Sequence, residues 1–133
     1  MKGDSVLTDA KAFQSFSVDD IAKARSFYQD TLGLEVAESP MGLELEVGDG
    51  NKVFVYSKPD HKPATFTILN FPVADVDTAV DRLKATGVRF ENYDLPNIKT
   101  DERGIARDPN GPSIAWFKDP AGNILSVLQE RAD

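Results

Sequence analysis

Hydrophobic and polar positions follow the same pattern twice along the chain. The first copy runs through "FQSFSVDDIAKARSFYQDTLGLEV" and the second through "FTILNFPVADVDTAVDRLKATGVRF". In each copy, apolar residues first alternate with polar ones, as in a half-buried strand, and then recur at the spacing of a helix. The aligned pairs are Val18 with Val73, Asp20 with Asp75, Ile21 with Val76, Ala24 with Ala79 and, after one gap, Gly33 with Gly87.

Each predicted helix has a start signal and a stop signal. Asp20 and Asp75 follow the strands, and an aspartate side chain there can accept from the free N–H groups of the first helical turn. Gly33 and Gly87 stand where a helix commonly ends in a left-handed turn. The apolar stripe between these signals predicts two helices packed on a hydrophobic core.

Extended segments follow each helix. They read "LEVAES", "GLELEV" and "NKVFVYS" in the first copy and "VRFENYDL", "SIAWFK" and "NILSVLQ" in the second. The turns "GDG" and "DPAGN" join the last two segments of each set into hairpins. Each copy is therefore predicted to be a βαβββ module, with module one at about residues 10–58, a linker at about 59–63 and module two at about 64–130. A repeat of roughly 55 to 70 residues cannot bury its own sheet, so we expect one domain over residues 1–133.

Composition narrows the function classes. The chain has no cysteine, which excludes disulfides, thiolate metal sites and a thiol nucleophile. A net charge of −7 argues against a nucleic-acid backbone as partner. No apolar run approaches a membrane span, and the N-terminus lacks the apolar core of a signal peptide. We therefore expect a cytoplasmic protein that binds neither nucleic acid nor membrane.

The motifs "VDDIAKARSFYQDTLGLEV", "VADVDTAVDRLKATGV" and "IAWFKDPAGN", together with the repeat, cover nearly the whole chain. This combination resembles the vicinal oxygen chelate superfamily, whose members include glyoxalase I, bleomycin resistance proteins, extradiol dioxygenases and fosfomycin resistance enzymes. The resemblance implies an α+β fold in which two βαβββ modules form a cup-shaped mixed sheet with the helices outside and the ligand inside. It also implies a homodimer.

Metal-dependent members of that family carry ligands at four cup-facing positions, one on the first and one on the last strand of each module. The resemblance places these positions on Phe13, Ile68, Ser126 and either Phe54 or Val55. None is a customary metal ligand, because divalent catalytic metals need several imidazole, carboxylate or thiolate donors. The single histidine, His61, lies in the linker. We therefore expect no metal and no other cofactor.

Strand alternation predicts what lines the cup. If Phe13 points inward, so does Ser15, and the "DPAGN" turn sets Trp116 beside Ser126 on one face. Such a lining, chiefly apolar with a few polar points, is typical of a small-molecule pocket. The alternative is that these side chains fill the cup as ordinary core, and Trp116 fits either role. The candidate ligand-binding residues are Phe13, Ser15, Ile68, Asn70, Arg107, Trp116 and Ser126.

Residues 96–113 form a long polar insert that could cover the cup. Its Arg103 and Arg107 are candidates for an anionic ligand group, or they pair with Asp101, Glu102 or Asp108 in a solvated loop. In module one, the simplest interpretation of Glu44 and Glu46 is the solvent face of a strand, although acids at the rim would suit a basic drug. These alternatives stay open at the level of the sequence.

Three functions fit the pattern. The first is a metal-free small-molecule-binding protein similar to the bleomycin resistance branch, with the ligand in an apolar cup. The second is a glyoxalase-like lyase, an isomerase or a dioxygenase with an unrecognised metal site. The third is an interaction module whose cup is filled by its own core. The missing metal donors favour the first, and no nucleophile constellation supports an enzyme.

Overall fold

A computed structural model describes residues 6–130, so both ends of the predicted domain 1–133 lie outside the described residues. The first repeat folds as a strand, a short helical region and a three-stranded meander, as predicted. Its elements are β1 (Gln14–Val18), α1 (Ile21–Ser26), η2 (Phe27–Thr31), β2 (Glu35–Ser39), β3 (Gly42–Val47) and β4 (Asn51–Ser57).

The second repeat begins in the same way and is longer in its middle. Its elements are β5 (Thr67–Pro72), α2 (Val76–Ala85), β6 (Asp94–Leu95), β7 (Ile98–Lys99), β8 (Ile105–Arg107), β9 (Ser113–Lys118) and β10 (Ile124–Gln129). Strands β6 and β7 form a small hairpin of their own. The expected α+β class is therefore confirmed.

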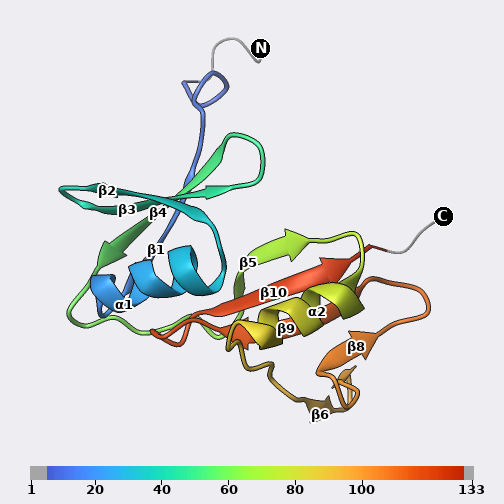
Figure 1. Cartoon of the computed structure of the whole chain (residues 1–133). Coiled ribbons are helices and arrows are strands. Elements are labelled where there is room, and N and C mark those ends of the chain that lie inside the picture. Colours follow the sequence, from blue (N-terminus) through green and yellow to red (C-terminus); the bar gives the residue numbers. More distant parts are fainter. Residues whose placement is uncertain (1–5, 131–133) are drawn as a thin grey trace.

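The two four-stranded sheets have equivalent topologies (Figure 1). One sheet has the order β1-β4-β3-β2 and the other β5-β10-β9-β8. In each sheet the first strand of the repeat pairs in parallel with the last, and the other pairs are antiparallel. The internal repeat predicted from the sequence is therefore a repeat in three dimensions.

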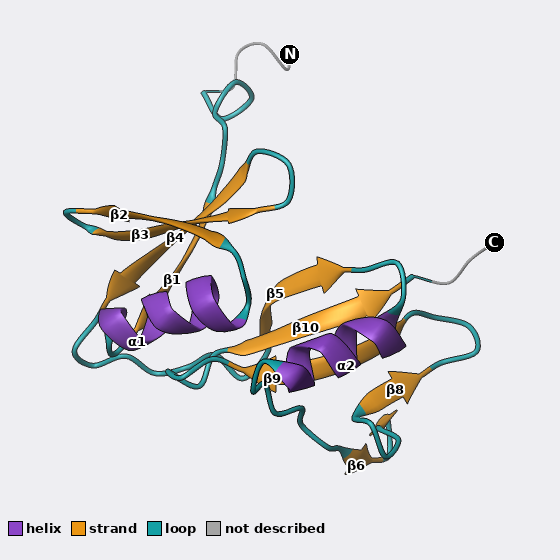
Figure 2. Cartoon of the chain, viewed as in Figure 1, coloured by secondary structure: helices purple, strands orange, loops and turns teal. Residues whose placement is uncertain are grey.

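Both helices lie on one side of the sheets, and each covers the sheet of its own repeat (Figure 2). The strand residues that face the helices are apolar and buried, including Val18, Leu45 and Val55, which are all 0% exposed. Burial of this apolar surface is the main stabilising term of such a layered fold. The side of the sheets away from α1 and α2 is called the open face below.

The predicted helix signals are confirmed. A side-chain oxygen of Asp20 accepts from the backbone N–H of Lys23 at 3.1 Å, and one of Asp75 accepts from that of Thr78 at 3.2 Å. Both aspartates have extended backbones, as N-cap residues require. Gly33 ends the first helical region with a φ of 77°, in the left-handed region that glycine adopts without strain.

The first helical region contains a π-helix that the sequence did not predict. After Ser26 the hydrogen bonds widen, and the N–H of Leu32 donates to the carbonyl of Phe27 at 2.9 Å. A wider turn rotates the following side chains relative to those of α1. In this turn Tyr28 is 0% exposed, and its ring contacts those of Phe16 and Phe27.

The structure differs from one prediction for the second repeat. The segment "VRFENYDL" is not a continuous strand: Phe90 makes an isolated bridge to Phe117, and the N–H of Glu91 donates to the carbonyl of Trp116. The chain then leaves the sheet and returns as β8, inside the segment predicted as an insert. Gly104 allows this return, because a Cβ there would lie 3.0 Å from the Cβ of Phe90.

A buried polar network joins the two repeats. The hydroxyl of Tyr28 donates to Oδ2 of Asp119 at 2.6 Å, and the amide of Asn123 bridges Asp119 Oδ2 and the carbonyl of Ser17, both at 3.0 Å. Burial and the neighbouring Asp119 raise the pKa of Tyr28, so its hydroxyl stays a donor. The "DPAGN" turn therefore does more than reverse the chain: it fixes the β9–β10 hairpin to the first repeat.

His61 adds a second link at the same seam. Its Nε2 lies 3.1 Å from the carbonyl oxygen of Ala121, and its Nδ1 lies 2.6 Å from Oγ of Ser17. Because a carbonyl only accepts, Nε2 carries a proton, and the Ser17 hydroxyl can donate to an unprotonated Nδ1. The only histidine of the chain is thus engaged in joining the predicted linker to both repeats.

Candidate functional site

Three of the candidate residues meet on the open face of the second sheet. In the strand register, Ser126 of β10 lies between Asn70 of β5 and Trp116 of β9. Cross-strand neighbours in a sheet share one face. The predicted pairing of Trp116 with Ser126 is therefore confirmed.

Ser126 is buried and already bonded. It is 0% exposed, and its hydroxyl donates to Oδ1 of Asn70 at 2.6 Å. The serine hydroxyl thereby fixes the carbonyl side of the Asn70 amide, and the amide nitrogen is the end that remains to donate to a bound molecule. Asn70 itself is exposed.

A register shift in the second sheet changes which residue of β5 meets Trp116. The pairing of β5 with β10 is irregular between Ile124 and Leu125, so Ile68 has no partner of its own. Nε1 of Trp116 donates to Oγ1 of Thr67 at 3.2 Å, and Ile68 packs against the hydrophobic core. Thr67, which the sequence analysis did not propose as a site residue, is thus the β5 side chain in contact with the indole.

A hollow of about 850 Å³ lies beside Trp116. One wall is the open face of β8 and β9, and the other is the β6–β7 hairpin with the loop that follows β8. Its volume lies in the range of small-molecule pockets. The apolar lining, apart from Trp116, consists of Leu95, Pro96, Ile98, Ala106, Pro109, Pro112 and Ile114.

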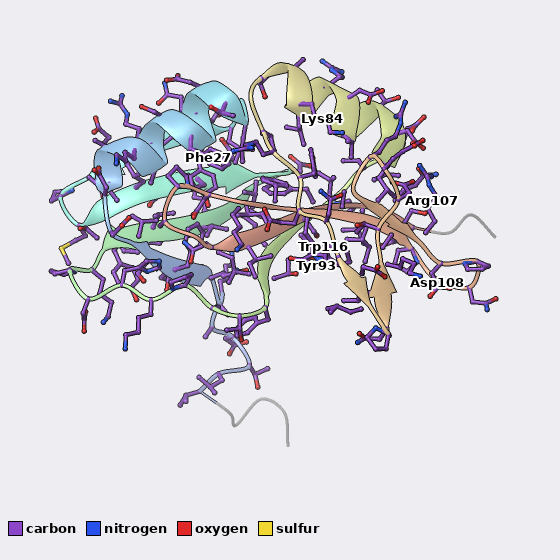
Figure 3. All side chains as sticks on the ribbon, turned by 90° about the horizontal axis from the view of Figure 1, so that it is seen from below. Phe27, Lys84, Tyr93, Arg107, Asp108 and Trp116 are labelled. Atoms are coloured by element: carbon purple, nitrogen blue, oxygen red, sulfur yellow. The ribbon has the colours of Figure 1, made fainter. Side chains whose placement is uncertain are left out.

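Tyr93 supports the aromatic side of this hollow. Its ring packs edge-on against Trp116 with the ring centroids 5.5 Å apart (Figure 3). Its backbone N–H donates to Oγ1 of Thr100 at 2.8 Å, which fixes Tyr93 at the base of the β6–β7 hairpin. Burial, and then the charge of Glu91, raise the pKa of Tyr93. Sequence reasoning missed Tyr93 because its contact with Trp116 depends on where the hairpin turns back.

Arg107 lines the hollow but is bound to carboxylates. Its Nη2 lies 2.6 Å from Oδ1 of Asp77, and its Nε donates to Oδ2 of Asp101 at 3.0 Å. The hydrogen bond from Arg107 lowers the pKa of Asp77. The hydrogen bonds to Asp77 and Asp101 together raise the pKa of the Arg107 guanidinium. Of the two interpretations of this arginine, the structure shows the ion pair with Asp101 and adds Asp77 of α2.

Phe13 and Ser15 lie away from that hollow, in the first repeat. Phe13 precedes β1 and is 74% exposed, and Ser15 pairs in register with Phe54 of β4. Phe54 stands on the open face, whereas Val55 is 0% exposed beneath the helix. Of the two residues proposed for this position, Phe54 is therefore the one on the open face.

The open face of the first sheet is acidic and aromatic. Glu44 and Glu46 point away from the helices, and the rings of Phe54 and Tyr56 stack with centroids 6.1 Å apart. A hydrogen bond with Glu35 raises the pKa of Glu46, since two neighbouring carboxyl groups share a proton more easily than they ionise together. The prediction that Glu44 and Glu46 lie on the face opposite the buried leucines is confirmed.

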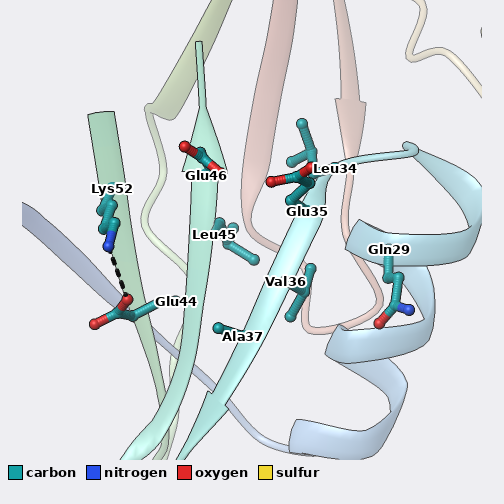
Figure 4. Close-up of a pocket in the computed structure, with 9 residues that line it drawn as sticks. All are labelled: Gln29, Leu34, Glu35, Val36, Ala37, Glu44, Leu45, Glu46 and Lys52. Carbon is teal, nitrogen blue, oxygen red and sulfur yellow. Dashed lines mark ion pairs between the residues drawn. The ribbon is translucent and has the colours of Figure 1, made fainter. Parts of the chain in front are cut away.

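A second hollow, of about 480 Å³, borders these acids (Figure 4). Its lining comes from both faces of the edge strands, because Val36 and Leu45 belong to the side that carries α1, whereas Glu35 and Glu46 belong to the open face. Nζ of Lys52, on β4, lies 3.6 Å from Oε1 of Glu44 on the neighbouring strand β3. This second hollow is smaller than the one at Trp116.

The side chains that the resemblance places at the four family metal positions do not offer the donors that a divalent metal needs. Phe13, Phe54 and Ile68 carry no donor atom, and the Ser126 hydroxyl is engaged by Asn70. Neutral hydroxyls and hydrocarbon side chains are poor ligands for divalent metals. Within residues 6–130, no three His, Asp or Glu side chains are grouped as a metal site.

A protein-family model for the Glyoxalase/Bleomycin resistance protein/Dioxygenase superfamily matches residues 12–127. The fold, its doubled topology and this match together show that the chain belongs to that superfamily. No curated protein matches the chain. No helix in the described part of the chain is long and apolar enough to cross a membrane.

Solved structures with the same fold span the superfamily. An antibiotic binding protein from Streptomyces sp. CB03234, TnmS3, is 26% identical with a TM-score of 0.61, over 92% of this chain and 98% of that one. A lactoylglutathione lyase from Agrobacterium tumefaciens is 23% identical with a TM-score of 0.64, over 91% and 93%. The fosfomycin resistance protein FosX from Listeria monocytogenes is 16% identical with a TM-score of 0.67, over 91% and 93%.

Proposed function

We propose that this protein is a cytoplasmic, metal-free small-molecule-binding protein that holds its ligand against Trp116 and does not transform it. The observation that carries the proposal is the hollow of about 850 Å³ with an aromatic and proline-rich lining. The antibiotic-binding function of the similar protein TnmS3 supports the same class of activity. An antibiotic or a compound of similar size is the ligand class that fits.

The polar points on the open face have a separate role in this proposal. Asn70 can orient a ligand that extends from the hollow along β10, because Ser126 holds its amide in one orientation. The indole N–H of Trp116 is engaged by Thr67, so the ring offers its π surface rather than a hydrogen bond. Affinity in such a site comes mainly from buried apolar area, and orientation comes from a few fixed polar groups.

Trp116 provides the test, because it is the only tryptophan in the chain. We expect its fluorescence to change on titration with binding members of a panel of antibiotic-sized compounds. Ala106→Phe would fill the hollow and weaken binding at least tenfold, since Ala106 is half-buried in its wall. Ala37→Phe, on the edge strand of the other repeat, is the matched control. A panel with no response, or equal binding by both variants, contradicts the proposal.

The enzymatic alternative is a lyase, an isomerase or a dioxygenase with a metal site that the four family positions do not reveal. Metal analysis of protein purified without chelators separates the two functions. The binding proposal predicts substoichiometric metal and ligand affinities unchanged by EDTA. Stoichiometric nickel, zinc, iron or manganese would favour the enzyme.

We also propose that the protein is a homodimer. Phe13 and Phe66 precede β1 and β5 and are 74% and 66% exposed. The side-chain amide of Gln14 donates to the carbonyl of Ile68, which brings the starts of these two strands together. Burying both rings against a second copy would remove a large apolar area from water. Light scattering should give twice the chain mass of 14.6 kDa, and a single-chain mass at all concentrations would refute the dimer.

A further inference from the structure

The charged groups at the Trp116 hollow are paired unequally. Four charged side chains line it: Asp94, Lys99, Arg107 and Asp108. Two of these side chains are acidic and two are basic. What a ligand meets, however, depends on which of these charges are already neutralised by neighbours.

Both cations are already engaged. Nζ of Lys99 lies 3.6 Å from Oδ1 of Asp94, its partner across the β6–β7 hairpin. The guanidinium of Arg107 is held between two carboxylates, those of Asp77 and Asp101. An anionic ligand would have to displace one of these carboxylates to reach Arg107.

Arg103, the other arginine of this region, does not make the charge of the cluster positive. Nη1 of Arg103 lies 3.2 Å from Oδ1 of Asp81 and 3.5 Å from Oδ1 of Asp77. Two guanidinium groups thus face three carboxylates, because Asp101 completes the set through Arg107. This cluster on the α2 side of the hollow therefore carries a net negative charge.

Asp108 adds an unpaired negative charge at the rim. Its carboxylate accepts from the backbone N–H of Asn110 at 2.9 Å and pairs with no lysine or arginine in the described residues. It follows Arg107 in sequence, both residues line the hollow, and Figure 3 shows them on the same side of Trp116 and Tyr93. A cation entering the hollow would meet this carboxylate without displacing an existing partner.

The aromatic wall favours the same sign of charge. The face of Trp116, the aromatic residue of the lining, carries negative electrostatic potential and attracts cations. The Trp116 N–H, the positive edge of the indole, is engaged by Thr67. The chain as a whole has a net charge of −7, which steers cations toward it.

We propose that the ligand of the Trp116 hollow is a planar aromatic molecule bearing a positive charge. The inference rests on the proposed function and specifies the chemistry of that same site. It replaces the expectation that Arg107 meets an anionic group: Arg107 instead holds Asp77 and Asp101 in place, and Asp108 meets the ligand's charge.

Two tricyclic dyes of similar size and opposite charge test the proposal: proflavine, a cation at neutral pH, and anthracene-2-sulfonate, an anion. Their affinities are measured by fluorescence anisotropy with the full chain. We expect proflavine to bind at least about fivefold more tightly, and added NaCl to reduce the difference. Asp108→Asn should weaken proflavine binding roughly two- to fivefold, the range for one exposed charge pair. Asp49→Asn, in the β3–β4 turn of the other repeat, removes the same charge and should leave the affinity unchanged.

The outcomes distinguish the two proposals. Tighter binding of anthracene-2-sulfonate overturns the charge assignment, and so does equal proflavine binding by Asp108→Asn and the wild type. In either case the small-molecule function stands if Ala106→Phe abolishes the binding. If neither dye binds while uncharged compounds quench Trp116, the ligand class is wrong. If nothing in the panel binds, the proposed function itself fails.

Discussion

The hydrogen bond between Tyr28 and Asp119 should be a principal link between the two repeats. Tyr28→Phe removes only the hydroxyl, which is buried and lies 2.6 Å from Oδ2 of Asp119. The variant keeps the ring contacts with Phe16 and Phe27. The carboxylate retains three N–H donors, two from Asn123 and one from Ala121. The change therefore isolates one buried hydrogen bond to a carboxylate.

Hydrogen bonds to charged groups contribute about 1.5–3 kcal/mol to the free energy of unfolding. For a chain of 133 residues, an unfolding entropy of about 2.1 cal/mol/K per residue converts this loss into a Tm decrease of roughly 5–10 °C. Calorimetry and urea titration measure both quantities. Tyr56→Phe is the matched control, because Tyr56 is half-buried on the open face of β4 and has no hydroxyl partner within residues 6–130.

Alkaline pH gives a second readout of the same bond. The pKa of Tyr28 is raised above its ordinary value of 10.0 in the folded protein, so its contribution to stability is fully present below that value. As the pH rises above about 10, the unfolded tyrosine ionises first and favours unfolding. The stability difference between the wild type and Tyr28→Phe should therefore shrink. Equal unfolding free energies for Tyr28→Phe and Tyr56→Phe at neutral pH would refute the role of this bond.

Further predictions concern the start of β8 and the ion pairs of Arg107. Gly104→Ala and Gly50→Ala both place a side chain at positive φ, 87° and 80°, which costs roughly 1–2 kcal/mol in each. Only the first brings a Cβ within 3.0 Å of Phe90, so urea titration should show a further loss of about 1–3 kcal/mol for Gly104→Ala. Equal losses would contradict this close approach. The pKa values of Asp77 and Asp101 are lowered in the fold, so their contribution is present above pH 3.8 and is lost as the pH falls further. Between about pH 5 and pH 2, the free energy of unfolding should therefore fall less for Asp77→Asn than for the wild type. Parallel curves for the two proteins would refute the stabilising role of the ion pair between Asp77 and Arg107.

The repeat and the orientation of its strands could be predicted from the sequence because they follow from local patterns. Phe16 and Val18 alternate with serines, so one face of β1 had to be buried. Asp20 and Asp75 cap their helices through contacts three residues away. The pairing of Trp116 with Ser126 follows from the length of the turn between β9 and β10.

The rest depends on contacts between distant residues. The segment after α2 has the composition of a single strand, but it pairs with β9 only at Phe90 and Glu91 before the chain turns away. The ionic partner of Arg107 on α2 lies 30 residues earlier in the chain, and no local pattern indicates it. The hollow exists only because the β6–β7 hairpin folds beside Trp116. Sequence patterns therefore predicted the sheet face and Trp116, and they indicated residues 96–113 as an insert that could cover the cup, but they did not predict the β6–β7 hairpin within the opposite wall.

The most direct test of the proposed binding site is a crystal structure of the protein with the tightest-binding compound of the panel. We expect the compound to lie against the ring of Trp116, between Ile114 of β9 and Ile98 of the β6–β7 hairpin, with its positive charge toward Asp108. A compound bound instead on the acidic open face of the first sheet, or in the groove beneath α2 lined by Phe71 and Leu83, would contradict it.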